Sequence, residues 1–175
     1  MKPYGLPNRI NAELCAKILE SPKLLNYIYY TDKENQYDDL FELTPPKSSE
    51  VLDKFLFIGR RPPIFIKEVG AYVSIRVNRY EPLSTNKSMK LIKWVEINID
   101  VICHIDCQKT TRGTRDITIV TLLQEALENE CLTGIADNTE IVSTTQILGL
   151  PVEYDGYQLK IRVTGFNQGL YNETD

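Results

Sequence analysis

The sequence predicts an α+β domain in which an antiparallel β-sheet with a long hairpin is covered on one face by amphipathic helices. Residues 91–107 carry apolar side chains at the odd positions from Val95 onward and mainly polar ones between them, which is typical of a half-buried strand. Residues 71–80 alternate in the same way, and residues 114–131 carry apolar side chains at helical spacing. Because a polar loop joins the two strands, we expect a hairpin whose apolar face packs under that helix.

The chain of 175 residues is long enough to bury a core without a metal or a disulfide, so we expect one domain over residues 1–175. We divide it into a helical N-terminal segment with an acidic loop (1–60), the sheet with its main helix (64–166) and a polar tail (167–175). The net charge of −4 gives no basic field for nucleic acid. With no signal-like N-terminus and no long apolar run, we expect a soluble protein with free thiols in its core.

The N-terminal segment predicts two helices and a loop. Residues 8–20 have helical spacing with Asn8 as the expected N-cap, and Pro22 is expected to begin a second, short helix. Packing on the sheet is the simpler interpretation of this pair, and docking of a partner is the alternative. Residues 31–50 predict a loop, whose acidic run we interpret as solvated because its spacing does not match a calcium-binding loop.

The segment before the first long strand is less regular. Residues 51–58 fit either a helical turn or a strand, and Gly59 with Pro62-Pro63 predicts a turn. The adjacent Arg60 and Arg61 are either solvated or partners in an intersubunit salt bridge.

The C-terminal third predicts the main helix and a second hairpin. Gly113 and Thr114 are expected to start the helix and Gly134 to follow its end. Residues 139–148 and 157–166 are strand-like, and we expect Asp155-Gly156 to form the hairpin turn between them.

Residues 103–107 hold the best candidates for metal or catalytic chemistry. A strand places Cys103 and Cys107 on one face, with their sulfurs roughly 13 Å apart, and His104 and Asp106 on the other. Tetrahedral zinc needs each sulfur about 2.3 Å from one ion. We therefore expect no metal site here.

No other pattern predicts catalysis. The motifs of serine hydrolases and phosphate-binding loops are missing from the sequence, and Glu96 and Asp100 would lie about 13 Å apart on a strand, too far for a glycosidase pair. We expect no catalytic residue, no cofactor and no enzyme activity. A nucleic-acid platform built on the sheet also lacks its glycine–aromatic signature. The basic residues considered for it are Arg76, Arg79, Lys160 and Arg162.

The order of elements resembles the small tail-terminator and tail-completion proteins of long-tailed bacteriophages. The likeness covers about residues 70–166 and lies in WVEINIDVICHID, TRGTRDITIVTLLQEALENECLTGI and YQLKIRVTGF. It implies a hexameric ring that caps the tail tube and faces the head connector. The implied partners are copies of the chain, the tube protein, the connector or neck proteins and, in contractile tails, the sheath. It also implies synthesis in the host cytoplasm and a final place in the virion tail or neck, with no membrane and no sequence-specific nucleic acid.

The polar face of the hairpin and its tip are the expected contact surfaces, with Trp94 as the anchor because tryptophan is enriched at interface hot spots. The alternatives are another neck, connector or adaptor protein that acts by binding, and an unrecognised small enzyme. The interface candidates are Trp94, Glu96, Asn98, Asp100, Tyr72, Arg76, Lys87, Arg60 and Arg61.

Overall fold

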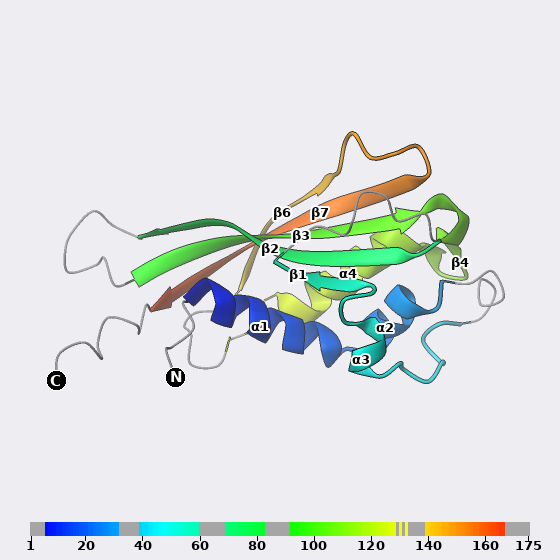
Figure 1. The fold of residues 1–175 in the computed structure, drawn as a ribbon, viewed down its shortest axis with the longest axis horizontal. Coiled ribbons are helices and arrows are strands. Elements are labelled where there is room, and N and C mark those ends of the chain that lie inside the picture. The colour runs from blue at the N-terminus through cyan, green and yellow to red at the C-terminus, as the bar shows by residue number, and fades with distance from the viewer. Residues whose placement is uncertain are drawn as a thin grey trace.

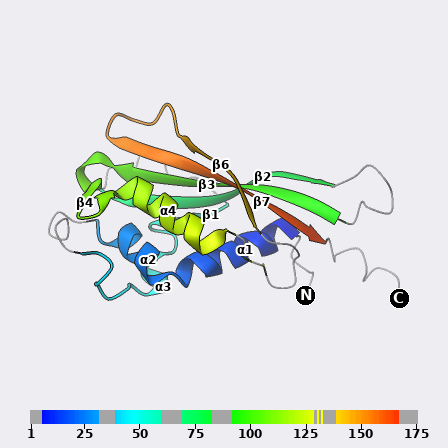
Figure 2. The same ribbon diagram turned by 180° about the vertical axis from the view of Figure 1, so that it is seen from behind.

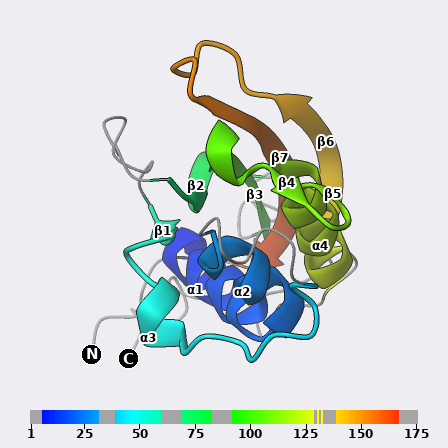
Figure 3. The ribbon, with the colours of Figure 1, turned by 90° about the vertical axis from the view of Figure 1, so that its right-hand side faces the viewer.

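The computed structural model describes residues 6–31, 39–59, 69–82, 92–128, 130, 132 and 139–166. A five-stranded sheet has the order β1-β2-β3-β7-β6, and helices lie along one of its faces (Figures 1 and 3). The predicted α+β class is therefore confirmed. One detail differs: β1 runs parallel to β2, so the sheet is mixed rather than wholly antiparallel.

The helices and strands have the following bounds. The helices are α1 (Leu6–Leu19), α2 (Pro22–Tyr29), α3 (Ser48–Val51) and α4 (Arg115–Leu127), with a 3₁₀ turn, η3 (Ile105–Cys107). The strands of the main sheet are β1 (Leu56–Ile58), β2 (Ala71–Pro82), β3 (Ile92–His104), β6 (Glu140–Gln146) and β7 (Tyr154–Phe166). A small second ladder joins β4 (Lys109–Thr110) to β5 (Gly113–Thr114).

The helix boundaries confirm most of the sequence predictions. Pro22 opens α2 and Thr114 is the N-cap residue of α4, as expected. Asn8 lies inside α1 and is not its N-cap, because the helix begins two residues earlier. Residues 51–58, for which the sequence fitted either a helical turn or a strand, contain the end of α3 followed by β1.

The loop after α2 is tied to the helix layer in its described part. Asn26 Nδ2 donates hydrogen bonds of 2.8 Å to the carbonyl oxygens of Leu40 and Leu43. The guanidinium of Arg112 binds both carboxylate oxygens of Asp39 at 3.1 and 2.6 Å. Residues 32–38, which hold most of the predicted acidic run, lie outside the described residues.

The core lies between the sheet and helices α1, α2 and α4. Val95, Ile97, Ile99, Val101 and Cys103 of β3 are all fully buried, which confirms the predicted apolar row as far as Cys103; Ile105, which was expected to continue the row, is 51% exposed. Helix α4 packs against β3 and β7, while α1 and α2 pack against β2. Burial of each aliphatic side chain stabilises the fold by about 1.5–3 kcal/mol.

Strand β3 is shorter than the predicted residues 91–107, because the chain turns into η3 after His104. Its pairing with β7 runs without a break, but its pairing with β2 has a bulge at Asn78. Beyond that bulge the alternation of β2 shifts by one residue, so Arg79 lies on the face of the sheet opposite the helices and Tyr80 does not. Figures 1 and 2 show the ends of β2 and β3 extending beyond α1.

Asp155-Gly156 is not the hairpin turn that the sequence predicts. Both residues lie inside β7, and the connection from β6 runs through residues 147–153, where Gly149 has a φ of 79°. Gly156 instead allows β7 to approach β3 closely, because a Cβ atom there would collide with the backbone oxygen of Val101.

Candidate functional site

The face of the sheet opposite the helices carries a continuous network of polar side chains. In β3 it presents Trp94, Glu96, Asn98 and Asp100, and the register sets these between residues of β2 and β7. The described helices all lie on the other side (Figure 3). We call this surface the polar face.

The carboxylate of Asp100 is the most buried of the four β3 side chains on the polar face, at only 1% exposed. Arg76 Nη2 lies 2.6 Å from Asp100 Oδ2, and Gln158 Nε2 donates a 2.7 Å hydrogen bond to Oδ1. One charge from β2 and one amide from β7 therefore hold a β3 carboxylate, so three strands are joined by side chains as well as by backbone.

Glu96 is bound in a similar way four residues earlier in β3. Asn78 Nδ2 donates a 2.7 Å hydrogen bond to Glu96 Oε1, and Lys160 Nζ lies 3.4 Å from the same oxygen. Burial alone would raise the pKa of Glu96, but the hydrogen bond from Asn78 and the charges of Lys160 and Arg162 outweigh it, so its pKa is lowered. The carboxylate therefore stays ionised.

Trp94 lies between two arginines at the end of the network. The guanidinium carbons of Arg79 in β2 and Arg162 in β7 are each 5.2 Å from the centre of the Trp94 ring, within cation–π range. In a strand without a bulge, Arg79 would lie on the same face as Val73 and Val77, so the alternation of the sequence does not predict this contact. The bulge at Asn78 creates it, and no residue pattern indicates that bulge.

Each basic residue of the polar face has a carboxylate partner, so the face is close to neutral. Besides Arg76 with Asp100 and Lys160 with Glu96, Arg79 pairs with Glu81 at 2.7 Å and Arg162 with Glu140 at 3.9 Å. A surface that binds nucleic-acid phosphates needs unneutralised positive charge. The described part of this face does not offer it.

Comparison with known proteins identifies the family. The sequence matches the YomW family over residues 21–163. The chain belongs to the YomW family. This family is phage-associated. No curated protein matches the sequence.

The match to the YomW family runs from the start of α2 into β7, so it includes the whole β2–β3 hairpin and the polar face. Helix α1 lies outside the matched range. Among the described residues, no helix is both long and apolar enough to cross a membrane.

The structure brings six of the nine predicted interface residues onto one face. Trp94, Glu96, Asn98, Asp100, Arg76 and Tyr72 all lie there. Their exposure differs from the expected contact surface, because Trp94 and Arg76 are partly exposed while the others are buried. Tyr72 packs in an aromatic cluster with Phe55 and Phe57, at ring-centre distances of 6.1 and 6.5 Å. Arg60, Arg61 and Lys87 lie outside the described residues.

The cysteine–histidine segment does not have the strand geometry from which we derived a 13 Å sulfur separation. The chain turns at η3, where Cys107 Sγ donates to the carbonyl oxygen of His104 at 3.2 Å. Burial raises the pKa of both Cys103 and Cys107, which disfavours the thiolate that a nucleophile or a metal ligand needs. In the described part of the chain, no three His, Cys, Asp or Glu side chains are grouped to hold a metal ion.

A buried arginine lies beside these thiols, at a position where the sequence predicts no functional residue. Arg115 is 1% exposed, and it donates 2.6 Å hydrogen bonds to the carbonyl oxygens of Cys107 and Tyr27. It thereby joins η3, the end of α2 and the start of α4, which is a structural role.

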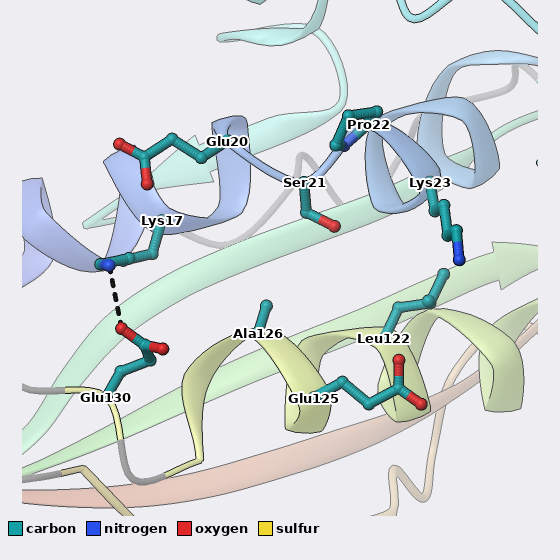
Figure 4. A pocket seen from close by; sticks show the side chains of 9 residues that line it. All are labelled: Lys17, Glu20, Ser21, Pro22, Lys23, Leu122, Glu125, Ala126 and Glu130. Carbon is teal, nitrogen blue, oxygen red and sulfur yellow. Dashed lines mark ion pairs between the residues drawn. The ribbon is translucent and has the colours of Figure 1, made fainter.

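An open pocket of about 380 Å³ lies where α1 meets α2, facing α4 (Figure 4). Lys17 Nζ and Glu130 Oε2 are 2.9 Å apart across one end. Its lining has five charged side chains around a few apolar ones, and holds no arrangement of acid, base and nucleophile. The lining residues are Lys17, Glu20, Ser21, Pro22, Lys23, Leu122, Glu125, Ala126 and Glu130.

Proposed function

We propose that this chain is a structural protein of the phage particle that assembles with copies of itself into a ring. In this role the ring, a hexamer, caps the tail tube at the neck and joins it to the head connector, as in the tail-terminator proteins that the sequence resembles. Its neighbours would be the tube protein, the connector and, in a contractile tail, the sheath.

The observation that carries this proposal is the direction of the two edge strands. Strand β1 runs parallel to β2, whereas β3, β7 and β6 each run antiparallel to the strand before them in the sheet. The edges β1 and β6 therefore point in opposite directions. A second copy placed beside the first in the same orientation would continue the sheet as an antiparallel ladder, and such head-to-tail contacts form a ring when the rotation closes.

Strand β6 has the composition of an edge that another strand could join. Its sequence EIVSTTQ contains four β-branched residues and one charge. It lacks the lysine and proline that usually protect the edges of natural sheets from pairing with another strand. A bulge at Val142 interrupts the ladder, but the register from Ser143 to Gln146 is regular. In the described part of the chain, β6 pairs with β7 alone.

The polar face gives a second line of support. Four of its buried polar atoms have no hydrogen-bond partner among the described residues: Ser74 Oγ, Arg76 Nε, Asn98 Oδ1 and Arg162 Nε. A buried ionic network that is only partly satisfied stabilises a fold little. Trp94 and Arg76 are the partly exposed predicted interface residues of this face, so a neighbour would contact them.

The test adds guarding charges to β6. Val142→Lys/Thr145→Lys places two lysines on the edge strand, and Ser49→Lys/Thr121→Lys adds the same charge on exposed positions of α3 and α4. The mass of each protein is measured by sedimentation velocity, alone and after mixing with purified tail tubes. We expect the wild type and the control to form one closed species on the tubes and the edge variant to remain monomeric, while all three melt alike.

One outcome decides against the ring, and another decides against β6 as its interface. A wild type that stays monomeric and does not bind tubes removes the ring and favours another neck, connector or adaptor protein. An edge variant that assembles like the control leaves the ring but shows that β6 is not its interface.

A further inference from the structure

The loop between β6 and β7 presents apolar side chains to solvent. Leu148 and Val152 are each 86% exposed, and Ile105 of η3, hydrogen-bonded to this loop, is 51% exposed. Figures 1 and 3 show the loop projecting away from the helices, at the end of the sheet near β4. We call Ile105, Leu148 and Val152 the apolar tip.

The apolar tip is held in place by backbone hydrogen bonds at both ends of the loop. The Ile147 amide donates to Gly156, the Tyr154 amide to Pro151 and the Ile105 amide to Glu153, each at 2.9 Å. Because the loop is fastened to β7 and to η3, its apolar groups are presented with little further loss of entropy on binding.

Carboxylates lie next to the apolar tip along the chain. Asp106, Glu153 and Asp155 are exposed, as is Lys109 of β4. The segments 104–109 and 147–158 therefore carry three carboxylates and one lysine. A complementary surface therefore has an apolar pocket with a basic rim.

The pocket between α1, α2 and α4 does not fit this requirement. Its lining carries three glutamates and two lysines (Figure 4), and one of those lysines, Lys17, is already paired with Glu130. An acidic tip would meet a net negative rim there, which argues against a second copy of the chain as the occupant.

We propose that the apolar tip docks into an apolar pocket rimmed by lysine or arginine on a different protein of the same phage. This inference rests on the proposed function, because a ring in the tail must hold a neighbour along the tail axis as well as its own copies. Leu148 and Val152 enter the pocket, and the carboxylates bind the lysine or arginine side chains at its rim.

The test places a photoreactive benzoylphenylalanine at the apolar tip. Val152→benzoylphenylalanine is compared with Ser49→benzoylphenylalanine, an exposed position on α3, by irradiating phage-producing cells and purified particles. Cross-linked peptides are then identified by mass spectrometry. We expect position 152 to cross-link to one other phage protein, at an apolar surface flanked by lysine or arginine. Adding Leu148→Ser should lower the yield at least tenfold.

Each other outcome overturns the inference: a cross-link to a second copy, a cross-link to an acidic or wholly polar surface, or no cross-link above that of position 49. Failure of the proposed function is seen separately. A chain that is monomeric in the sedimentation test and missing from particles removes the ring, while a cross-link in cells still supports docking by the tip.

Discussion

The carboxylate of Asp100 offers the sharpest test of the polar face. Asp100→Asn keeps the shape of the side chain and its contact with Gln158, but it removes the charge that faces Arg76 at 2.6 Å. Breaking a buried ion pair costs about 3–5 kcal/mol. Because the side chain of Arg76 is 25% exposed and keeps some hydration, we expect a loss of about 2–3 kcal/mol, or about 4–12 °C in Tm for a chain of this size.

Two matched variants separate the ion pair from other effects. Asp106→Asn removes a carboxylate whose side chain is 50% exposed and should change the free energy of unfolding by less than about 0.5 kcal/mol. Arg76→Met/Asp100→Leu replaces both partners by apolar groups, and we expect it to unfold within about 1 kcal/mol of the wild type.

The assay is urea unfolding followed by circular dichroism, at two protein concentrations because self-association raises the apparent stability. An Asp100→Asn protein within about 0.5 kcal/mol of wild type would refute the reasoning, since then Arg76 gains nothing from the charge. So would a double variant that is as unstable as the single one, since the cost would then come from shape and not from an unpaired charge.

Three further predictions follow from buried or close-packed groups. The pKa of Glu96 is lowered from its ordinary value of 4.5. Its ionised form therefore stabilises the fold above about pH 4.5, and that contribution is lost as the pH falls through the folded-state pKa. The difference in the free energy of unfolding in urea between wild type and Glu96→Gln should shrink between pH 7 and pH 3. Gly156→Ala places a methyl group against the backbone oxygen of Val101 and should cost about 3 kcal/mol in urea unfolding, whereas Gly149→Asn, at a φ of 79° in an open turn, should cost less than about 1 kcal/mol. The buried thiols Cys15, Cys103 and Cys107 have raised pKa values. A Cys131→Ser protein, which keeps only these three thiols, should therefore react with a thiol reagent at pH 8 only after unfolding. Rapid labelling of the native protein would contradict their burial.

The sequence predicted the parts of the fold that periodicity controls. The alternation from Val95 to Cys103 identified the core face of β3 correctly, because burial on one face requires that period. The helical spacing within α4 identified most of its core face, but Ile117 of the predicted apolar stripe is 51% exposed. The errors lie where a local backbone event interrupts the period. The bulge at Asn78 and the turn at η3 change which side a residue faces without any change in composition. Gly156 shows a related ambiguity, because the sequence alone does not distinguish a glycine required for close strand packing from one required for a turn.

The candidate site was predicted as residues of both hairpin strands, of their loop and of an arginine pair, without any statement of which side chains bind each other. The sequence placed Glu96, Asn98 and Asp100 together because they share a face of β3. It could not pair them with Arg76, Asn78 or Gln158, because which residues oppose each other depends on the register of β2 and β7. The register also neutralises the basic residues one by one, which composition alone cannot indicate.

Substitutions on β6 and on the apolar tip test the two proposals one at a time. The helix layer buries the core, the edge β6 lies at one side of the sheet, and the apolar tip projects from one end of it. Lysines on β6 should abolish the ring and leave the tip able to cross-link its partner in cells. Serine at Leu148 should leave the ring intact and abolish docking. A chain in which either substitution removes both activities would show that ring closure and docking use one surface.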